Sequence, residues 1–107
     1  MTIRYKNAKV DLTTTNATDI FTIPNATPAV IKSILVSEDS GNADTITLTL
    51  TDSASAIFSL FKVKAVSANT TVELLTAPLV LAESEKITAQ AATANRLHIV
   101  VSYMEIS

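Results

Sequence analysis

The chain contains no cysteine and no tryptophan, and it has only one glycine and one histidine among its 107 residues. Without cysteine, disulfides and thiolate metal sites are excluded, and cysteine usage gives no indication of the redox compartment. A single glycine excludes the glycine-rich loops that cradle phosphates. A single histidine without cysteine offers too few ligands for a transition-metal site within one chain. We therefore expect no cofactor and no metal.

Charged residues are also scarce, at 17% of the chain with a net charge of −2. The basic residues are scattered singly, whereas nucleic-acid binding requires clustered lysine and arginine. No apolar run approaches the ~18 residues that a membrane helix needs, and the first residues lack the apolar core of a signal peptide. We expect neither a nucleic acid nor a membrane as partner.

Hydrophobic residues nonetheless make up 48% of the sequence, and the mean hydropathy is +0.35. A chain this short has a large surface for its volume. The apolar excess therefore has to go into a core, a subunit interface, or both. We expect both.

Alternation of apolar and polar residues with a period of two dominates the sequence. It is clearest where Ile46, Leu48 and Leu50 alternate with threonines, which predicts a strand with its apolar face inward. Further strands are predicted at Ile3–Leu12, Asp19–Ile23, Ala29–Ser37, Ala56–Val66, Thr71–Leu75, Leu79–Leu81, Lys86–Ala91 and Arg96–Ile106. The composition of Leu79 to Ala94 also permits a helix, but we expect strands there. This pattern predicts one all-β domain over residues 1–107, an antiparallel, jelly-roll-like β-sandwich of about eight short strands.

Two of the predicted strands are apolar on both faces. In Ala29–Ser37, period two places Ile31 and Leu35 opposite the other apolar residues, and the last strand has a similar second face. A sandwich needs one apolar face per strand, and exposed apolar patches usually mark interfaces. We therefore predict a subunit interface made by these second faces, namely Val30, Ile34, Val36, Val100, Met104 and Ile106. Cover by a loop of the same chain is the alternative.

The sequence offers little material for catalysis. His98 lies mid-strand between Leu97 and Ile99, and no strand-to-helix nucleophile turn accompanies it. We interpret His98 as structural or interfacial and expect no enzyme. A hydrolase using carboxylates such as Asp11 or Glu73 is the catalytic alternative.

The turn from Glu38 to Asp44 concentrates oxygen ligands that a calcium ion would accept. It lacks the alternating acidic pattern and the closing glutamate of the best-known calcium loop. We predict a hairpin turn in which Gly41 takes a positive φ and the Asp39 side chain bonds to its own backbone. Calcium binding by residues 38–44 stays open as the alternative.

Three of the eight basic residues, Arg4, Lys6 and Lys9, lie in the first segment of the chain, residues 1–15. A basic terminal strand suits docking on an acidic partner surface, where opposite charge speeds encounter. The other interpretation is an edge strand whose lysines block unwanted sheet pairing. The sequence leaves both open.

A series of short motifs extends across almost the whole chain. They are Ile23-Pro24, Ala29–Ser37, the Asp39-Ser40-Gly41 turn, Thr45–Leu48, Leu74-Leu75, Pro78–Leu81 and Val101–Ile106. This pattern resembles small β-sandwich virion structural proteins of tailed bacteriophages, including those of cyanophages. Glu83-Ser84-Glu85 departs from the family, which usually has a Gly-Asp turn there.

The resemblance implies a non-enzymatic virion protein that forms homotrimers. It implies a capsid decoration (cement) protein on the outer capsid surface, which binds the major capsid protein or another virion protein and stabilises the shell. A tail or head-fibre module that binds a host surface is the alternative within the same group. The motifs carry no catalytic residues.

Overall fold

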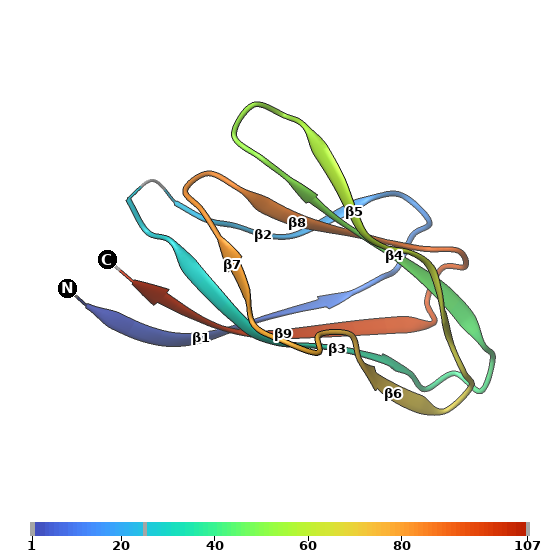
Figure 1. Ribbon diagram of the computed structural model, residues 1–107. Helices are drawn as coiled ribbons and strands as arrows, with labels where there is room; N and C mark the ends of the chain where they lie inside the picture. Colours follow the sequence, from blue (N-terminus) through green and yellow to red (C-terminus); the bar gives the residue numbers. More distant parts are fainter. Residues whose placement is uncertain (1, 25, 107) are drawn as a thin grey trace.

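The computed structural model describes residues 2–24 and 26–106, so Met1 of the predicted docking segment lies outside the described residues. Within these residues the chain forms nine strands, whose arrangement can be followed in Figure 1. They are β1 (Ile3–Asp11), β2 (Thr18–Thr22), β3 (Ala29–Glu38), β4 (Asp44–Thr51), β5 (Ile57–Val66), β6 (Thr70–Glu73), β7 (Leu79–Leu81), β8 (Lys86–Ala91) and β9 (Leu97–Ile106). Among the described residues, no helix has the length and apolar character to span a membrane.

The strands form two antiparallel sheets with nested pairing. In the first, which we call sheet A, the order is β1-β9-β3-β6, and the short β7 also pairs with β3; in sheet B it is β2-β8-β4-β5. The outermost strands in sequence pair with each other, β1 with β9, then β2 with β8, β3 with β6, and β4 with β5. A long antiparallel ribbon folded over into two layers gives this order, which is that of a jelly roll. The predicted all-β sandwich is confirmed.

One hydrophobic cluster fills the space between the sheets. Ile46 and Leu48 of β4 are completely buried, and Leu50 packs against the cluster as a partly buried residue. The threonines that alternate with them lie on the other side of the strand and are partly exposed. The predicted register of this strand is confirmed, because one face of each strand supplies the core of a sandwich.

A bulge in β3 changes the face on which its later residues lie. Ile31 pairs with Tyr103 and Ser33 pairs with Ser102, so β3 advances two residues while β9 advances one. The extra residue, Lys32, shifts the alternation by one position. Ile34 and Val36 therefore face the core together with Ile31, and the prediction that they lie on the opposite face from Ile31 is wrong.

Candidate interaction surface

The outer face of sheet A carries a row of apolar side chains. The row lies at the end of the sheet where β1 begins and β9 ends, which Figure 1 shows side by side. Strand register places Tyr5 of β1 beside Met104 of β9, Met104 beside Val30 of β3, and Val30 beside Val80 of β7. In the next row, Ile3 lies beside Ile106. Residues that face each other in a ladder project from the same side of the sheet. We call this group the apolar patch: Ile3, Tyr5, Val30, Val80, Met104 and Ile106.

The patch is open to solvent and contains no charged side chain. Tyr5 is 81% exposed, Val80 is 64% exposed and Ile3 is 47% exposed. Val30, Met104 and Ile106 are each partly exposed. Exposed single apolar residues are ordinary on protein surfaces, whereas a contiguous group across four strands is typical of an interaction site.

The predicted interface residues are only partly brought together. Val30, Met104 and Ile106 belong to the apolar patch, and Val100 lies further along the same face beside Leu35. Ile34 and Val36 are 0% exposed in the core of the single chain, so no second subunit can contact them. The bulge at Lys32 is the physical reason for this correction.

Sequence reasoning missed Ile3, Tyr5 and Val80 as members of this surface. Ile3 and Tyr5 lie on a strand in which basic residues are interspersed, and Val80 lies on a strand of only three residues. The patch becomes visible only when neighbouring strands are aligned in register, as they are for Tyr5 with Met104 and Val80 with Val30.

The three predicted docking residues lie on two faces of β1. Arg4 and Lys6 project on the same side as Glu105 and Tyr103, whereas Lys9 projects with Val100 on the outer face. The ammonium of Lys6 lies 2.9 Å from Oε1 of Glu105. Burial raises the pKa of the neighbouring Tyr103 hydroxyl; the Glu105 charge adds to this and Lys6 opposes it.

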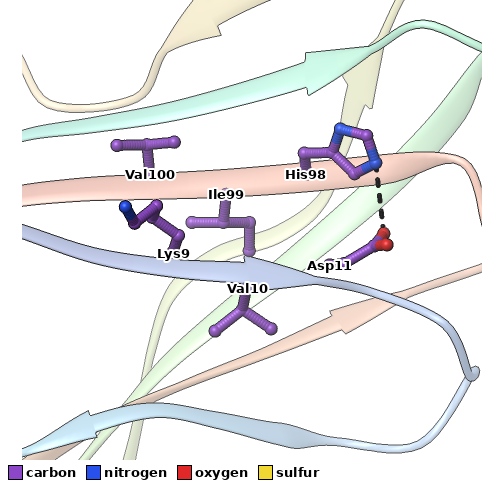
Figure 2. A pocket seen from close by; sticks show the side chains of 6 residues that line it. All are labelled: Lys9, Val10, Asp11, His98, Ile99 and Val100. Carbon is purple, nitrogen blue, oxygen red and sulfur yellow. Dashed lines mark ion pairs between the residues drawn. The ribbon is translucent and has the colours of Figure 1, made fainter.

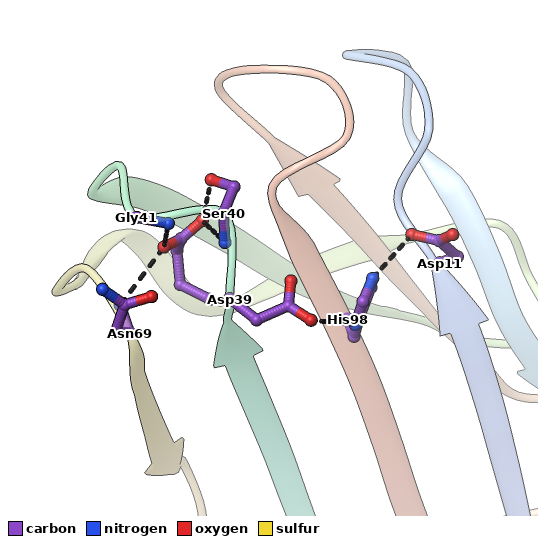
Figure 3. Close-up of polar contacts among 7 residues, drawn as sticks. Asp11, Asp39, Ser40, Gly41, Asn69 and His98 are labelled. Carbon is purple, nitrogen blue, oxygen red and sulfur yellow. Dashed lines mark hydrogen bonds and ion pairs between the residues drawn. The ribbon is translucent and has the colours of Figure 1, made fainter.

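At the other end of the same face, His98 lies between two carboxylates. Its Nε2 is 3.1 Å from Oδ1 of Asp11, and its Nδ1 is 3.8 Å from Oδ2 of Asp39, as Figure 3 shows. Asp11 and His98 line a shallow hollow of about 390 Å³ together with Lys9 and Val100 (Figure 2). A Ser-His-Asp arrangement requires one ring nitrogen of the histidine to face a nucleophile. In this protein a carboxylate faces each ring nitrogen of His98.

Glu38 is almost completely buried, and its carboxylate organises two turns. The backbone N–H groups of Ser40, Gly41, Asn42 and Asn69 all donate to it, and the Ser40 hydroxyl donates as well. Figure 3 shows Ser40, Gly41 and Asn69 gathered at this point. Burial alone raises the pKa of Glu38, but the hydrogen bonds from Ser40, Asn69 and Gly41 outweigh it and lower the pKa to about 2.

The turn therefore differs from the prediction in one respect. Gly41 has the predicted positive φ of 84°. The carboxylate that bonds to the turn backbone belongs to Glu38, because Asp39 points instead toward His98. Asp44 accepts from the N–H groups of Thr45 and Thr93, at 2.8 and 3.1 Å. The acidic groups of this turn are directed apart, and the described part of the chain contains no cluster of three or more potential metal ligands.

Glu73, named in the catalytic alternative, also serves the backbone. Its Oε2 accepts the N–H of Ile34 at 2.8 Å, and its Oε1 accepts the Ser33 hydroxyl. This carboxylate occupies the gap along β3 between the ends of β6 and β7. It continues the edge of sheet A, where backbone donors would otherwise lack a partner.

The outer face of sheet B has a different character. Thr49 of β4 lies beside Thr88 of β8, and Asp19 of β2 pairs with Lys86 at 3.4 Å. A hollow of about 490 Å³ on this face is lined mostly by polar residues. Exposed apolar residues of this sheet are on its edge strand β5, at Ile57, Phe58 and Val63.

Comparison with known proteins shows fold similarity without sequence similarity. No protein-family model matches the chain, and no curated protein matches it. Among solved structures, the fold is similar to a subunit of Bacillus endospore appendages, described as disulfide-linked pili. The TM-score is 0.56 at 12% identity, over 96% of this chain and 87% of that one.

The fold is also similar to part of a chain in infectious bursal disease virus, Gt strain. The TM-score is 0.50 at 9% identity, and the match covers 96% of this chain but 32% of the viral one. At such low identity the similarity shows a shared β-sandwich fold alone. Since this chain has no cysteine, the disulfide linkage of the pili has no counterpart in its sequence.

Proposed function

We propose that this protein is a non-enzymatic structural subunit that assembles with copies of itself through the apolar patch. The observation that carries the proposal is the contiguous apolar surface over β1, β9, β3 and β7, whose six members are all uncharged and which Lys32 borders at a hollow beside Tyr5. Burying such a surface against another copy removes apolar area from water, which is the main driving force of association. The sequence resemblance supports a homotrimer as the assembled state.

The polar groups support a structural role over catalysis. The carboxylates of Glu38 and Glu73 accept backbone N–H groups. A carboxylate faces each nitrogen of His98. A catalytic site needs groups whose hydrogen-bonding capacity is directed at a substrate, whereas these groups hold strands and turns together.

We further propose that the assembly decorates a phage capsid as a cement protein. The resemblance to phage virion proteins supports this, and the jelly-roll order, which is common in viral capsid proteins, agrees with it. In this role the protein adds contacts across neighbouring capsid subunits and helps the shell resist the internal pressure of packaged DNA.

Sedimentation of the purified protein tests the assembly. We expect about three subunits at micromolar concentration, and a variant with Val80→Lys and Met104→Lys should sediment as a monomer because two ammonium groups would be buried. Thr49→Lys, on the outer face of sheet B, is the matched control and should leave the oligomer intact. A stable monomer of the unaltered 11.4 kDa chain would contradict the proposal.

Electron microscopy of virus particles that carry a labelled copy tests the location. Label distributed over the shell supports the decoration role. Label confined to the tail or to head fibres would replace it with the alternative module that contacts a host surface.

A further inference from the structure

The two sheets have four sides at which a strand lacks a neighbour, and most of them are protected. Strand β5 has two register shifts against β4, and β2 has one against β8. Val63 in β5 adopts a φ of 52°, and its N–H donates to the Thr47 hydroxyl at 3.1 Å instead of to a backbone carbonyl. β6 and β7 are only four and three residues long. Bulges and short strands are devices that keep edges from pairing.

Strand β1 lacks these devices. It pairs with β9 over all nine residues, from Ile3 with Ile106 to Asp11 with His98, without a register shift. At ~3.4 Å per residue it offers an edge roughly 30 Å long. A regular edge of this length is a template for another strand.

The register shows which backbone groups of β1 face this edge. The N–H of Leu12 donates to the carbonyl of its opposite residue Leu97 at 3.0 Å, so that pair is hydrogen-bonded. Hydrogen-bonded pairs alternate along an antiparallel ladder. Arg4, Lys6, Ala8 and Val10 therefore bond to β9, while Ile3, Tyr5, Asn7, Lys9 and Asp11 present their backbone groups to the free edge.

The charge on β1 restricts what can pair with that edge. Lys6 forms an ion pair with Glu105, and Oδ1 of Asp11 lies 3.1 Å from Nε2 of His98, so β1 carries three basic side chains and one acidic one. Within residues 2–24 and 26–106, Arg4 and Lys9 have no ion pair, and they lie on opposite faces of the strand. A second β1 would bring three more basic side chains to the same ladder, which like-charge repulsion disfavours. An acidic strand would gain opposite charge on both faces.

We propose that the free edge of β1 binds an extended acidic segment of a partner protein as an added strand of sheet A. The backbone groups of Tyr5, Asn7 and Lys9 supply the hydrogen bonds, and Arg4 and Lys9 select for carboxylates. This mode of recognition takes affinity from the main chain and specificity from side chains. The inference rests on the proposed function only in that a virion protein would be the natural partner. The edge uses backbone groups and the apolar patch uses side chains, and the residues that belong to both are Ile3 and Tyr5.

The test uses the full chain and a synthetic peptide of the length of β1 in which pairs of glutamates alternate with pairs of valines, so that carboxylates project from both faces of the added strand. Matched peptides carry glutamine or lysine in place of glutamate. By NMR at low salt, we expect saturable binding of the acidic peptide and slower amide exchange at Tyr5, Asn7 and Lys9, but not at Lys6 or Ala8, which already bond to β9. Equal binding of the lysine peptide, or protection confined to other strands, would overturn the proposal.

Variants at Asn7 separate strand addition from simple charge attraction. Asn7→Pro removes a donor from the free edge without removing a bond to β9, and an edge strand tolerates this change. We expect it to weaken peptide binding about tenfold, while Asn7→Ala, which keeps the N–H, should change it less than about twofold. Equal effects of the two variants would refute strand addition, and the amide protection in the unaltered protein decides the matter if Asn7→Pro does not fold.

The failure of this inference is distinguishable from failure of the proposed function. A variant with Val80→Asn and Met104→Asn, which adds no charge beside β1, should lose the oligomer yet bind the acidic peptide with unchanged affinity. If the unaltered protein is an oligomer but binds no acidic peptide, only the strand-addition inference fails. If it binds the peptide as a monomer, only the proposed assembly fails.

Discussion

Phe21 and Tyr103 stack on each other across the two sheets. Phe21 belongs to β2 of sheet B and Tyr103 to β9 of sheet A, and their ring centroids lie 4.6 Å apart with 9° between the ring planes. Both residues are partly buried at the edge of the core. The pair therefore fastens one sheet to the other near the end of the sandwich at which the apolar patch lies.

A double-mutant cycle with Phe21→Leu and Tyr103→Leu measures this contact. We expect a coupling free energy of about 0.5–1.5 kcal/mol, since stacked aromatic pairs contribute that much beyond the area that they bury. Urea unfolding of the four proteins gives the value. Strictly additive effects of the two substitutions would show that the rings do not stack in solution.

The register of β4 predicts a large difference between adjacent positions. Leu48 is completely buried, so Leu48→Ala should destabilise the protein by ~2–5 kcal/mol through lost burial and a cavity. Thr49→Ala, on the outer face of sheet B, should have a much smaller effect. Equilibrium denaturation of both variants checks this. A larger loss for Thr49→Ala would mean that the strand is inverted.

Glu38 makes stability depend on pH in the acid range. Its pKa in the folded protein is about 2, below its ordinary value of 4.5, because the N–H groups that it accepts from outweigh the effect of burial. A carboxyl group with a lowered pKa stabilises the fold fully above its unfolded pKa and loses this contribution as the pH falls toward the folded pKa. As the pH falls from 5 to 2, the protein should therefore lose the free energy of unfolding that this group contributes, and its melting temperature should fall.

The variant Glu38→Gln isolates that contribution. It should melt at a lower temperature than the unaltered protein at pH 7, and its melting temperature should depend less on pH in the acid range. Asp39→Asn is the control, because the neighbouring Asp39 carboxylate accepts none of these backbone bonds. An unchanged acid profile in Glu38→Gln would show that other carboxylates dominate.

The free basic residues of β1 predict a salt-dependent association with capsids. Replacing Arg4 and Lys9 with Gln should slow binding to undecorated capsids and weaken its dependence on salt, because opposite charge mainly speeds encounter. Lys6 is kept because Glu105, a largely buried carboxylate, would lose its partner. Lys62→Gln with Lys64→Gln, on β5, is the matched control. Identical rates and salt dependence in all variants would leave the basic residues with only the role of blocking unwanted pairing.

The period-two pattern was enough to predict the strands and their class. Predicted and observed bounds agree closely, and Leu79 to Ala94 contains β7 and β8, as expected, instead of a helix. The pattern succeeds because each strand of a sandwich must bury one face. It was also enough for the inward orientation of Ile46 and Leu48.

The surface could be predicted only in part. The bulge at Lys32 reverses the faces of Ile34 and Val36, and nothing in the local sequence distinguishes it from regular strand. Tyr5 and Val80 join the apolar patch through pairing with residues far along the chain. The role of Glu38 was missed because an Asp side chain in a turn commonly bonds to its own backbone, which favoured Asp39. The longer side chain of Glu38 instead reaches N–H donors in two turns.

The nested pairing of strands also determines how the chain can fold. The partner of Ile3 is Ile106, so β1 has no neighbour in sheet A until nearly the whole described chain has been synthesised. Only β4 with β5, whose first pair is Thr51 with Ile57, can form a ladder early and locally. Chains dominated by such distant contacts fold in milliseconds to seconds, more slowly than helical bundles. During synthesis, the apolar faces of β3 and β4 therefore stay exposed until β8 and β9 have been made. In that interval the chain depends most on protection from aggregation.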